Sequence, residues 1–368
     1  MPDDRTRRLG FIDSARTLAM ALMVQGHVCD NLLSASGKAS ELYQRHLLVR
    51  GLTGPLFFLV SGFAFVVASD SAWHEYGRPG DRLWGRLRRV ALLLGVGTLL
   101  QIPRWSGPAF TRDDWVYVLR CGVLHTIAWS LLTALGLIAL TRSRRAFTLA
   151  ALGLAALAIA AAPLASASGT MPVALGLLIR TQEGSLFPVV PWIAHFLLGA
   201  VAARLYLDVR HLGTSPRRLA LFTGSAGATL LLGGSLWQAL QPVDTRLLAV
   251  WVSDPAVFLS RAGLAWCVFA LFALALGRLA SRPWLKAVAS HALSIYVAHL
   301  VVLYGIPDHP GLVQRYGATL DLAQTYLTGP LLFVGCAIAM IALSSFAQAL
   351  GTRLRAAAAR VFLAGARG

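Results

Sequence analysis

The segment RTLAMALMVQGH, residues Arg16–His27, lies inside the first long apolar stretch of the chain. An arginine opens the segment and a histidine closes it, while Asp13 and Asp30 stand three residues beyond either end. The apolar residues between them are of the kind that cross a bilayer as a helix. Ionisable side chains in such a helix are costly in lipid and mark functional sites. This segment therefore predicts a membrane helix with one polar, interior face.

The composition of the whole chain supports a membrane protein. Of its 368 residues, 57% are hydrophobic and 13% are charged, and the mean hydropathy is +0.64. Soluble domains are about 25% charged, so a soluble fold could not bury this much apolar surface. The formal net charge of +17 fits lysine and arginine gathered on cytoplasmic loops, and we do not interpret it as a nucleic-acid surface.

The apolar segments predict an all-α, polytopic fold of about ten membrane helices around a polar cavity, in a single domain over residues 1–368. A span needs about 20 apolar residues. The third segment is the shortest because Pro103 ends it, and Arg204 interrupts the sixth. The first is expected to be a retained span, because it is too long for a signal peptide. The ten segments are 12–33, 48–69, 89–103, 119–140, 146–166, 190–207, 219–240, 255–277, 285–305 and 325–348.

The distribution of basic residues predicts that both termini are cytoplasmic. With the N-terminus inside and ten alternating spans, the cytoplasmic segments and Arg16 hold 23 of the 33 lysines and arginines. Cytoplasmic loops carry such an excess, and an even number of spans returns the C-terminus to the same side. The longer outside loops are then 34–47, 104–118, 167–189, 241–254 and 306–324.

Helical geometry places the polar residues of the first span on one face. Arg16 and His27 are eleven residues apart, which is three turns plus about 20° and about 16 Å of rise. Asp13 and Asp30 are i,i+3 neighbours of Arg16 and His27 and lie on nearly the same side. Lipid would not accept this face, so we expect it to line an interior cavity.

The chemistry of these residues suggests separate roles. Arg16, near the cytoplasmic end, can bind phosphate in a bidentate manner. His27 can take a proton from a nucleophile near neutral pH, and Asp30 could hold the imidazole in one tautomer. Two simpler interpretations stay open: Arg16 and Asp13 form only an interfacial capping pair, and His27 makes only a hydrogen bond between helices.

A second basic motif lies before the third span. Arg82, Arg86 and Arg89 of RLWGRLRRVALL fall at i, i+4 and i+7, on one face of a helix, where they could hold a phosphorylated ligand. The alternative is ordinary anchoring of a cytoplasmic loop.

The remaining histidines and the cysteines favour structural roles. We expect His125, His195 and His299 to make contacts between helices. The four cysteines form no CxxC pair and no metal-ligand spacing, so no metal site is expected and packing is the predicted role. They are Cys29, Cys121, Cys267 and Cys336.

Several motifs resemble the integral-membrane acyltransferase superfamily, which includes acyltransferase family 3 and the heparan-α-glucosaminide N-acetyltransferase family. FIDSARTLAMALMVQGH resembles the first helix, with the hallmark arginine and histidine at Arg16 and His27. GPLFFLVSGFAF resembles the second helix, and RLRR, Arg86–Arg89, matches an Arg-x-x-Arg pair after it. FPVVPWIAHFLLG and SHALSIYVAHL resemble later helices and lean toward the heparan-type branch. The usual Arg-Gly is Arg16-Thr17 in this chain, which puts the local helix packing in question.

The resemblance implies a membrane enzyme, an acyl-CoA-dependent O- or N-acyltransferase. Acyl-CoA, with acetyl-CoA the expected donor, would be bound in the cytoplasm by phosphate contacts to Arg16, Arg86, Arg89 and the neighbouring Arg82. His27 would act as general base or carry the acyl group, with Asp30 beside it. The acceptor would be an extracytoplasmic carbohydrate in the cell envelope, and the location the bacterial inner membrane. A homodimer is one arrangement that the sequence leaves open.

Two other classes of function share the same polar residues. A transporter or flippase would also have a cavity lined by histidine and arginine, although the sequence shows no paired broken helices in two repeats. A non-catalytic membrane protein would use the histidines and arginines only to hold its helices together.

Overall fold

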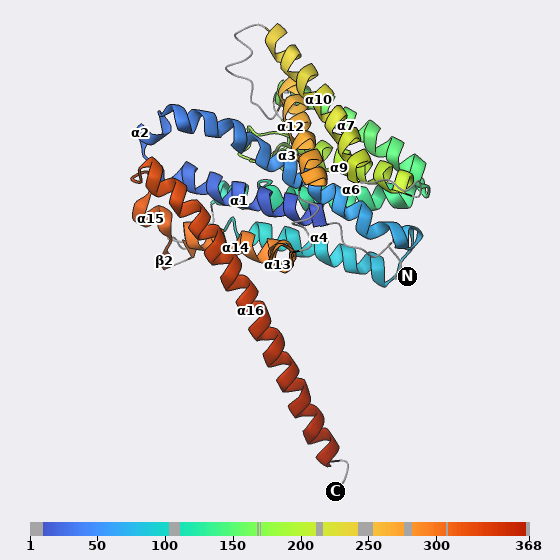
Figure 1. Ribbon diagram of the computed structural model, residues 1–368, viewed down its shortest axis with the longest axis vertical. Helices are drawn as coiled ribbons and strands as arrows, with labels where there is room; N and C mark the ends of the chain where they lie inside the picture. The colour runs from blue at the N-terminus through green and yellow to red at the C-terminus, as the bar shows by residue number, and fades with distance from the viewer. Residues whose placement is uncertain are drawn as a thin grey trace. The chain divides into compact units, whose positions relative to one another are not determined.

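The computed structural model is built almost entirely of α-helices (Figure 1). It describes residues 10–102, 111–167, 169, 171–210, 216–241, 253–275, 282–306 and 308–365. The predicted all-α class is confirmed, since the described strands are two residues long each. Pro103, at which the third predicted segment ends, lies outside the described residues.

Every one of the ten predicted segments contains helix. Among the described residues, seven helices are long and apolar enough to cross a membrane, and a bent pair of helices makes an eighth candidate. About ten spans is therefore not confirmed and stays a prediction. In chain order the helices at these ten segments are α1 (Gly10–Leu32), α3 (Glu41–Ser69), α4 (Asp81–Leu99), α6 (Val123–Thr141), α7 (Arg144–Ala167), α9 (Val189–Arg210), α10 (Pro216–Leu240), α12 (Pro255–Ala275), the bent pair α13 (Pro283–Ser290) and α14 (Ala292–Tyr304), and α16 (Leu322–Gly365).

Two of the ten helices, α1 and α4, are not among these candidate membrane spans. The α1 helix has 23 residues, enough to cross a bilayer, but it carries Asp13, Arg16 and Asp30. Most of its side chains are buried by protein. An interior helix can hold polar groups that a lipid-facing helix cannot. The α4 helix begins at Asp81, earlier than predicted, because its basic first turns continue the helix that was expected to begin at 89.

Short elements connect the long helices, and local capping explains where several of them begin. Ser34 accepts a hydrogen bond from the backbone N–H of Gly37 and starts α2. Thr111 and Asp114 form a capping box at the start of α5, and these hydrogen bonds hold the pKa of Asp114 below its usual value. The short elements are α2 (Ala35–Lys38), the 3-10 helix η2 (Asp70–Gly77), α5 (Arg112–Leu119), α8 (Val173–Ile179), β1 (Gly305–Ile306), β2 (His309–Pro310) and α15 (Leu312–Tyr316).

The contacts divide the chain into two compact units, and helix α1 contributes to both. The first unit holds residues 1–19 and 45–281, and the second holds 20–44 and 282–368. Arg16 thus belongs to the first unit and His27 to the second, although one unbroken helix carries both. The prediction of a single domain stays a prediction.

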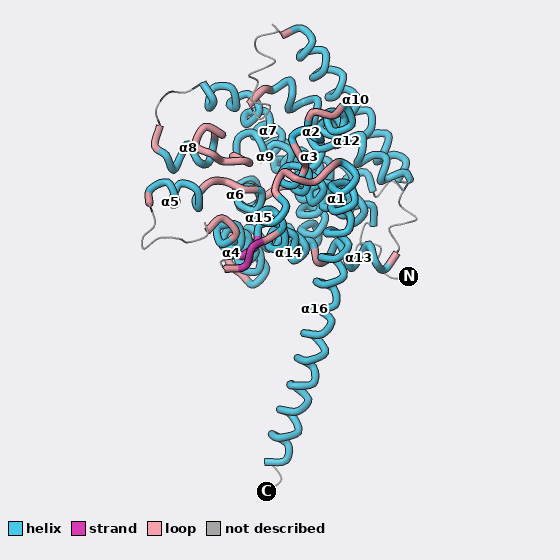
Figure 2. Tube along the Cα trace, turned by 90° about the vertical axis from the view of Figure 1, so that its left-hand side faces the viewer, coloured by secondary structure: helices cyan, strands magenta, loops and turns pink. Residues whose placement is uncertain are grey.

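Close helix packing organises the first unit. Helices α10 and α12 pack along much of their length, as do α7 and α9 (Figures 1 and 2). A side chain on Gly227 would lie 2.8 Å from the backbone nitrogen of Cys267, so α10 and α12 touch backbone to backbone at this point. A Cβ on Gly62 of α3 or on Gly199 of α9 would overlap the carbonyl of the facing helix. Small residues at such contacts are typical of membrane helices.

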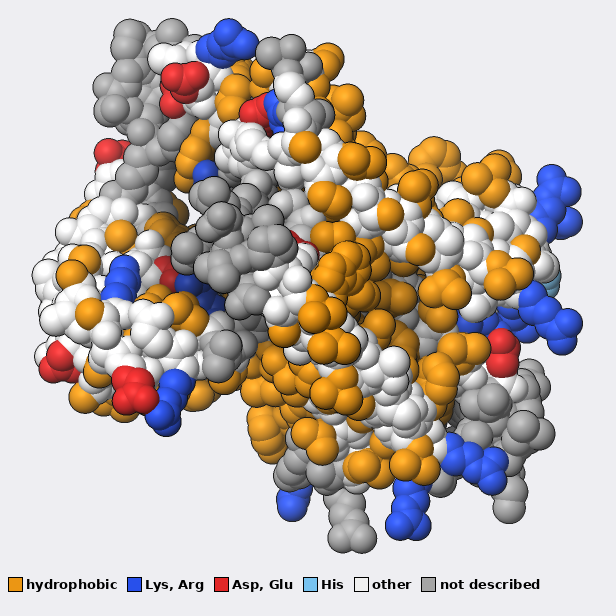
Figure 3. Space-filling view, turned by 90° about the horizontal axis from the view of Figure 1, so that it is seen from above, with side chains coloured by type: hydrophobic (Ala, Val, Ile, Leu, Met, Phe, Trp, Pro, Cys, Tyr) orange, Lys and Arg blue, Asp and Glu red, His pale blue; other side chains and the backbone are white. Residues whose placement is uncertain are grey.

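The helices of the first unit differ in the share of their residues that is buried: α9 is central, and α7 and α10 are outer helices. In the most apolar 18-residue stretch of α9, 72% of residues are buried, against 28% in α7 and 28% in α10. Large apolar side chains are exposed on the outer helices, and Figure 3 shows such side chains covering much of the face that it views. These faces suit contact with lipid. Exposed examples are Leu149, Leu157 and Leu164 on α7 and Leu221, Leu232 and Leu236 on α10.

The second unit is built around the C-terminal half of α1. Val28, Leu32 and Leu303 form a buried core, against which Leu312, Val313, Leu320 and Leu332 pack. The chain before α16 pairs with the end of α1, where Leu320 N–H donates to the Leu32 carbonyl at 2.9 Å and Ser34 N–H donates to the Leu320 carbonyl at 2.9 Å. The first turns of α16 lie beside α14, and the helix then runs on beyond it (Figure 1).

Candidate functional site

The polar face of α1 is withdrawn from solvent along its length. Asp13 is 3% exposed, and Arg16, His27 and Asp30 are half-buried. The unbroken helix from Gly10 to Leu32 confirms that the segment Arg16–His27 is helical. The helical spacing on which the face depends is therefore present.

In the second unit, His27 meets a histidine from another helix. The Nδ1 atom of His27 lies 3.3 Å from Nε2 of His299, which α14 carries, and the ring centroids are 5.3 Å apart. The His299 side chain has no exposed surface. Its other ring nitrogen, Nδ1, lies 3.2 Å from the carbonyl oxygen of Ile295, one turn earlier in α14. The expected interhelical role of His299 is therefore confirmed, and its partner is the predicted base.

Two more polar groups surround His27. The Asn31 amide donates to the His27 carbonyl at 2.7 Å and to the Tyr304 hydroxyl at 2.9 Å. The Tyr304 ring stands edge-on to the His27 ring with centroids 6.4 Å apart, and Tyr296 stands edge-on to His299 at 5.4 Å. One asparagine thus ties the helix that carries His27 to the end of α14.

Asp30 lies one turn beyond His27 in α1. Its backbone carbonyl accepts a hydrogen bond from Nζ of Lys38 at 2.7 Å. Asp30 follows His27 by three residues in α1, and i,i+3 positions face the same side of a helix. The proposed roles of Asp30, Arg16 and His27 in catalysis stay predictions.

The three predicted arginines lie on α4, but their surroundings differ. Arg82 pairs with Glu75 at 2.8 Å, and both side chains are exposed. Arg86 lies over the rings of Phe65 and Tyr76, at 5.5 and 5.6 Å from their centroids, and is half-buried, whereas Arg89 is exposed. Helix α4 confirms their helical spacing, and their binding of a phosphorylated ligand stays a prediction.

Sequence reasoning missed a buried charge cluster in the first unit. It noted Arg204 as an interruption of the sixth apolar segment, yet this side chain is 2% exposed in α9. Arg204 pairs with Asp70 at 2.5 Å and with Asp208 of its own helix, and it lies 5.6 Å from the centre of the Trp73 ring. A charged side chain inside an apolar segment usually pairs with another charged group or with backbone carbonyls, and Asp208 at i+4 was the available signal.

The other histidines and the cysteines have structural surroundings. His125 in α6 lies within hydrogen-bond distance of Thr98 at 3.1 Å and Gln101 at 3.2 Å, which confirms its role between helices. His195 stacks on Phe258 of α12 with ring centroids 4.0 Å apart. Cys29, Cys121 and Cys336 are buried and Cys267 is half-buried, in line with packing. Over the described residues, no group of three or more His, Cys, Asp or Glu could hold a metal ion.

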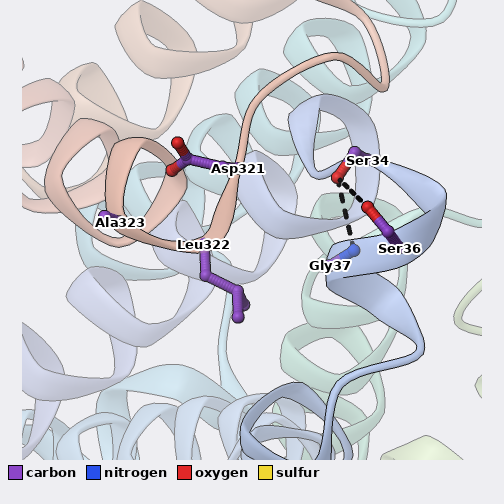
Figure 4. Close-up of a pocket in the computed structure, with 6 residues that line it drawn as sticks. All are labelled: Ser34, Ser36, Gly37, Asp321, Leu322 and Ala323. Atoms are coloured by element: carbon purple, nitrogen blue, oxygen red, sulfur yellow. Dashed lines mark hydrogen bonds between the residues drawn. The ribbon is translucent and has the colours of Figure 1, made fainter.

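An open pocket lies between α2 and the start of α16, in the second unit (Figure 4). Ser34 bonds to Gly37 and to Ser36 at 3.2 Å. Asp321 caps α16 by accepting from the Gln324 N–H at 2.8 Å. Since Ser34 and Asp321 already cap α2 and α16, we assign these polar side chains of the pocket to capping. The lining residues are Ser34, Ser36, Gly37, Asp321, Leu322 and Ala323.

Comparison with known protein families finds a match over more than half of the chain. The family model described as "Heparan-alpha-glucosaminide N-acetyltransferase, catalytic" matches residues 8–232. The match covers more than half of the chain and includes Arg16, His27 and the arginines of α4. No curated protein matches the chain.

Proposed function

Because the chain belongs to the heparan-alpha-glucosaminide N-acetyltransferase catalytic family, we propose that it is a membrane acyltransferase that uses acyl-CoA. It transfers an acyl group, acetyl in the first instance, from the cytoplasmic donor to a hydroxyl or amine of an extracytoplasmic carbohydrate. The observation that carries this proposal is the position of His27, half-buried in α1 and hydrogen-bonded to a second helix.

His27 acts as the general base of the reaction. It removes the proton from the acceptor hydroxyl or amine as the nucleophile attacks the thioester carbonyl. The carbon–sulfur bond then breaks, an ester or amide forms, and the CoA thiolate takes up the proton. The carboxylate of Asp30, one turn away, stabilises the imidazolium that forms in between.

The arginines bind the donor at the other end of α1. Arg16 holds a phosphate of CoA, and Arg86 and Arg89 of α4 hold the others, with Arg82 at the edge of this group. Arginine suits this role because its guanidinium binds phosphate in a bidentate manner and keeps its charge. The helical rise of about 16 Å between Arg16 and His27 leaves room for the neutral pantetheine arm in between.

The chain sits in the membrane with both termini in the cytoplasm, and the bacterial inner membrane is the compartment that suits a cytoplasmic donor and an envelope acceptor. The helices long and apolar enough to cross a bilayer support a multi-pass protein. The excess of arginine in the segments assigned to the inside supports this orientation.

Purified protein in detergent, supplied with radiolabelled acetyl-CoA, tests the activity. A glucosamine-terminated oligosaccharide offers an amine, and a periplasmic glucan offers hydroxyls. We expect the parent protein to transfer acetyl to one of these acceptors or to hydrolyse acetyl-CoA. His27→Ala should lower this rate by about 10²- to 10⁴-fold, the usual contribution of a general base.

The matched control is His74→Ala, because His74 is exposed in η2. It should keep the parental rate. A parent protein that neither transfers nor hydrolyses, or a His27→Ala variant with full activity, overturns the proposal. Movement of a labelled solute into vesicles without acyl transfer would favour a transporter instead.

A further inference from the structure

We propose that His299 is the positioning residue that sets the tautomer of His27 and leaves Nε2 of His27 as the basic atom. The inference rests on the proposed function for its catalytic meaning, but the tautomer itself follows from the hydrogen bonds of the second unit. It gives to His299 the orienting role that the sequence suggested for Asp30.

The argument starts at a backbone carbonyl in α14. The Ile295 oxygen lies 3.2 Å from Nδ1 of His299, and a carbonyl oxygen can only accept a hydrogen bond. The hydrogen of this bond must therefore be carried by Nδ1 of His299. In a neutral imidazole one nitrogen donates and the other accepts, so Nε2 of His299 is an acceptor.

The same argument applies to the ring of His27. Its Nδ1 lies 3.3 Å from the accepting Nε2 of His299, so Nδ1 of His27 is the donor and carries the hydrogen. Nε2 of His27 then holds the lone pair. A doubly protonated His299 would reverse the bond, but it would place a positive charge on a side chain with no exposed surface, which is costly.

This arrangement matches what general-base catalysis requires. A histidine base works when a partner holds one ring nitrogen in the N–H form, so that the other accepts the proton of the nucleophile. The partner is usually a carboxylate, but here it is the neutral imidazole of His299. The Ile295 carbonyl fixes which nitrogen of that imidazole carries the hydrogen. Tyr296 beside His299 and Tyr304 beside His27 are the titratable side chains whose rings stand edge-on to the pair.

Two substitutions of nearly equal size separate the roles of the two His299 nitrogens. The amide of His299→Gln reaches the place of Nε2, where its oxygen can accept from His27. The shorter amide of His299→Asn reaches only the place of Nδ1, so it can bond to Ile295 but offers His27 no acceptor. We expect kcat for acetyl transfer to fall less than about 10-fold in the glutamine variant and on the order of 10²-fold in the asparagine variant.

A purely structural role would not produce this pattern. The KM for acetyl-CoA and the Kd for CoA should stay at the parental values in both variants, because the phosphate contacts proposed for Arg16, Arg86 and Arg89 are untouched. The control is His291→Ala. Nδ1 of His291 lies 2.8 Å from the carbonyl oxygen of Ala287, one turn earlier, as Nδ1 of His299 does from Ile295. This variant should keep the parental kcat. Equal losses in the glutamine and asparagine variants overturn the inference.

Nitrogen-15 NMR of histidine-labelled protein reads the tautomer without any activity assay. The signals of His27 are assigned by their loss in His27→Gln. In the parent protein at alkaline pH, Nδ1 should be protonated and Nε2 bare, and His299→Asn should mix the two tautomers. A parent protein with its hydrogen on Nε2 overturns the inference, whereas an inactive parent with the expected tautomer overturns only the proposed function.

Discussion

At the scale of single residues, Arg204 shows how this chain keeps a charge inside an apolar helix. The guanidinium is 2% exposed and is shared between Asp70 and Asp208, while Arg144 approaches Asp70 from the surface at 3.2 Å. Removing one partner of a buried pair leaves a charge without compensation, and this costs about 3–5 kcal/mol when burial is complete. Asp70 is 31% exposed, so solvent lowers that cost.

We expect Asp70→Asn to destabilise the protein by about 1–3 kcal/mol, with thermal unfolding in detergent as the measurement. Arg144→Ala is the matched control, because its pair with Asp70 is 45% exposed on the arginine side and should be worth about 1 kcal/mol or less. If both variants unfold at the parental temperature, the cluster around Arg204 does not hold η2 against α9.

The arginines of α4 give the second prediction at this scale. Arg89→Ala and Arg86→Ala should each weaken CoA binding by about 1.5–3 kcal/mol, the contribution of a charged hydrogen bond. Arg82→Ala should do less, because Arg82 already pairs with Glu75. Titration calorimetry at low and high salt measures this, and added salt should reduce the parental affinity in the same direction. Unchanged Kd values for all three variants would make these residues anchors of a cytoplasmic loop.

At the scale of elements, helix α1 gives a test of spacing. It passes from the first unit to the second after Ala19, and an alanine inserted directly after Met20 falls one residue beyond this boundary, between Arg16 and His27. The insertion rotates His27 by about 100° relative to Arg16. We expect acetyl transfer to be lost while expression and CoA binding persist.

Four inserted residues, close to a full turn, restore the face but lengthen the gap by about 6 Å, and only weak activity should return. The readouts are the transfer rate and the Kd for CoA of each insertion variant beside the parent. Transfer at the parental rate by the one-residue variant would mean that Arg16 and His27 do not act from one helix face.

The elements also show what local sequence can and cannot predict. Helix positions were predictable because apolar runs and their polar ends are local, as in α7 and α12. The bend of 67° between α13 and α14 was not, because the predicted segment 285–305 runs through it. The contact of His27 with His299 joins residues 272 positions apart, and no local pattern contains such a pairing. The polar face of α1, by contrast, follows from helical spacing alone.

At the scale of the whole molecule, the number of spans decides which side each loop faces. If α1 and α4 cross the membrane with the eight candidates, ten spans place Ser36 outside and the basic turns of α4 inside. If neither crosses and the N-terminus is inside, Ser36 lies inside and those basic turns lie outside. The second arrangement would export the arginine-rich segment RPGDRLWGRLRR, against the usual distribution of positive charge.

Cysteine labelling in intact cells separates the two arrangements. The parent is a variant in which Cys29, Cys121, Cys267 and Cys336 are replaced, and single cysteines are then added at exposed positions, as Ser36→Cys, Arg88→Cys and Arg145→Cys. We expect a membrane-impermeant maleimide to label only the first, with the other two labelled after the cells are opened. Arg145→Cys is the internal control, because both arrangements place the turn between α6 and α7 in the cytoplasm. Labelling of Arg88→Cys but not of Ser36→Cys in intact cells would show that α1 and α4 do not cross. It would also place the proposed CoA-binding arginines of α4 on the side that the donor cannot reach.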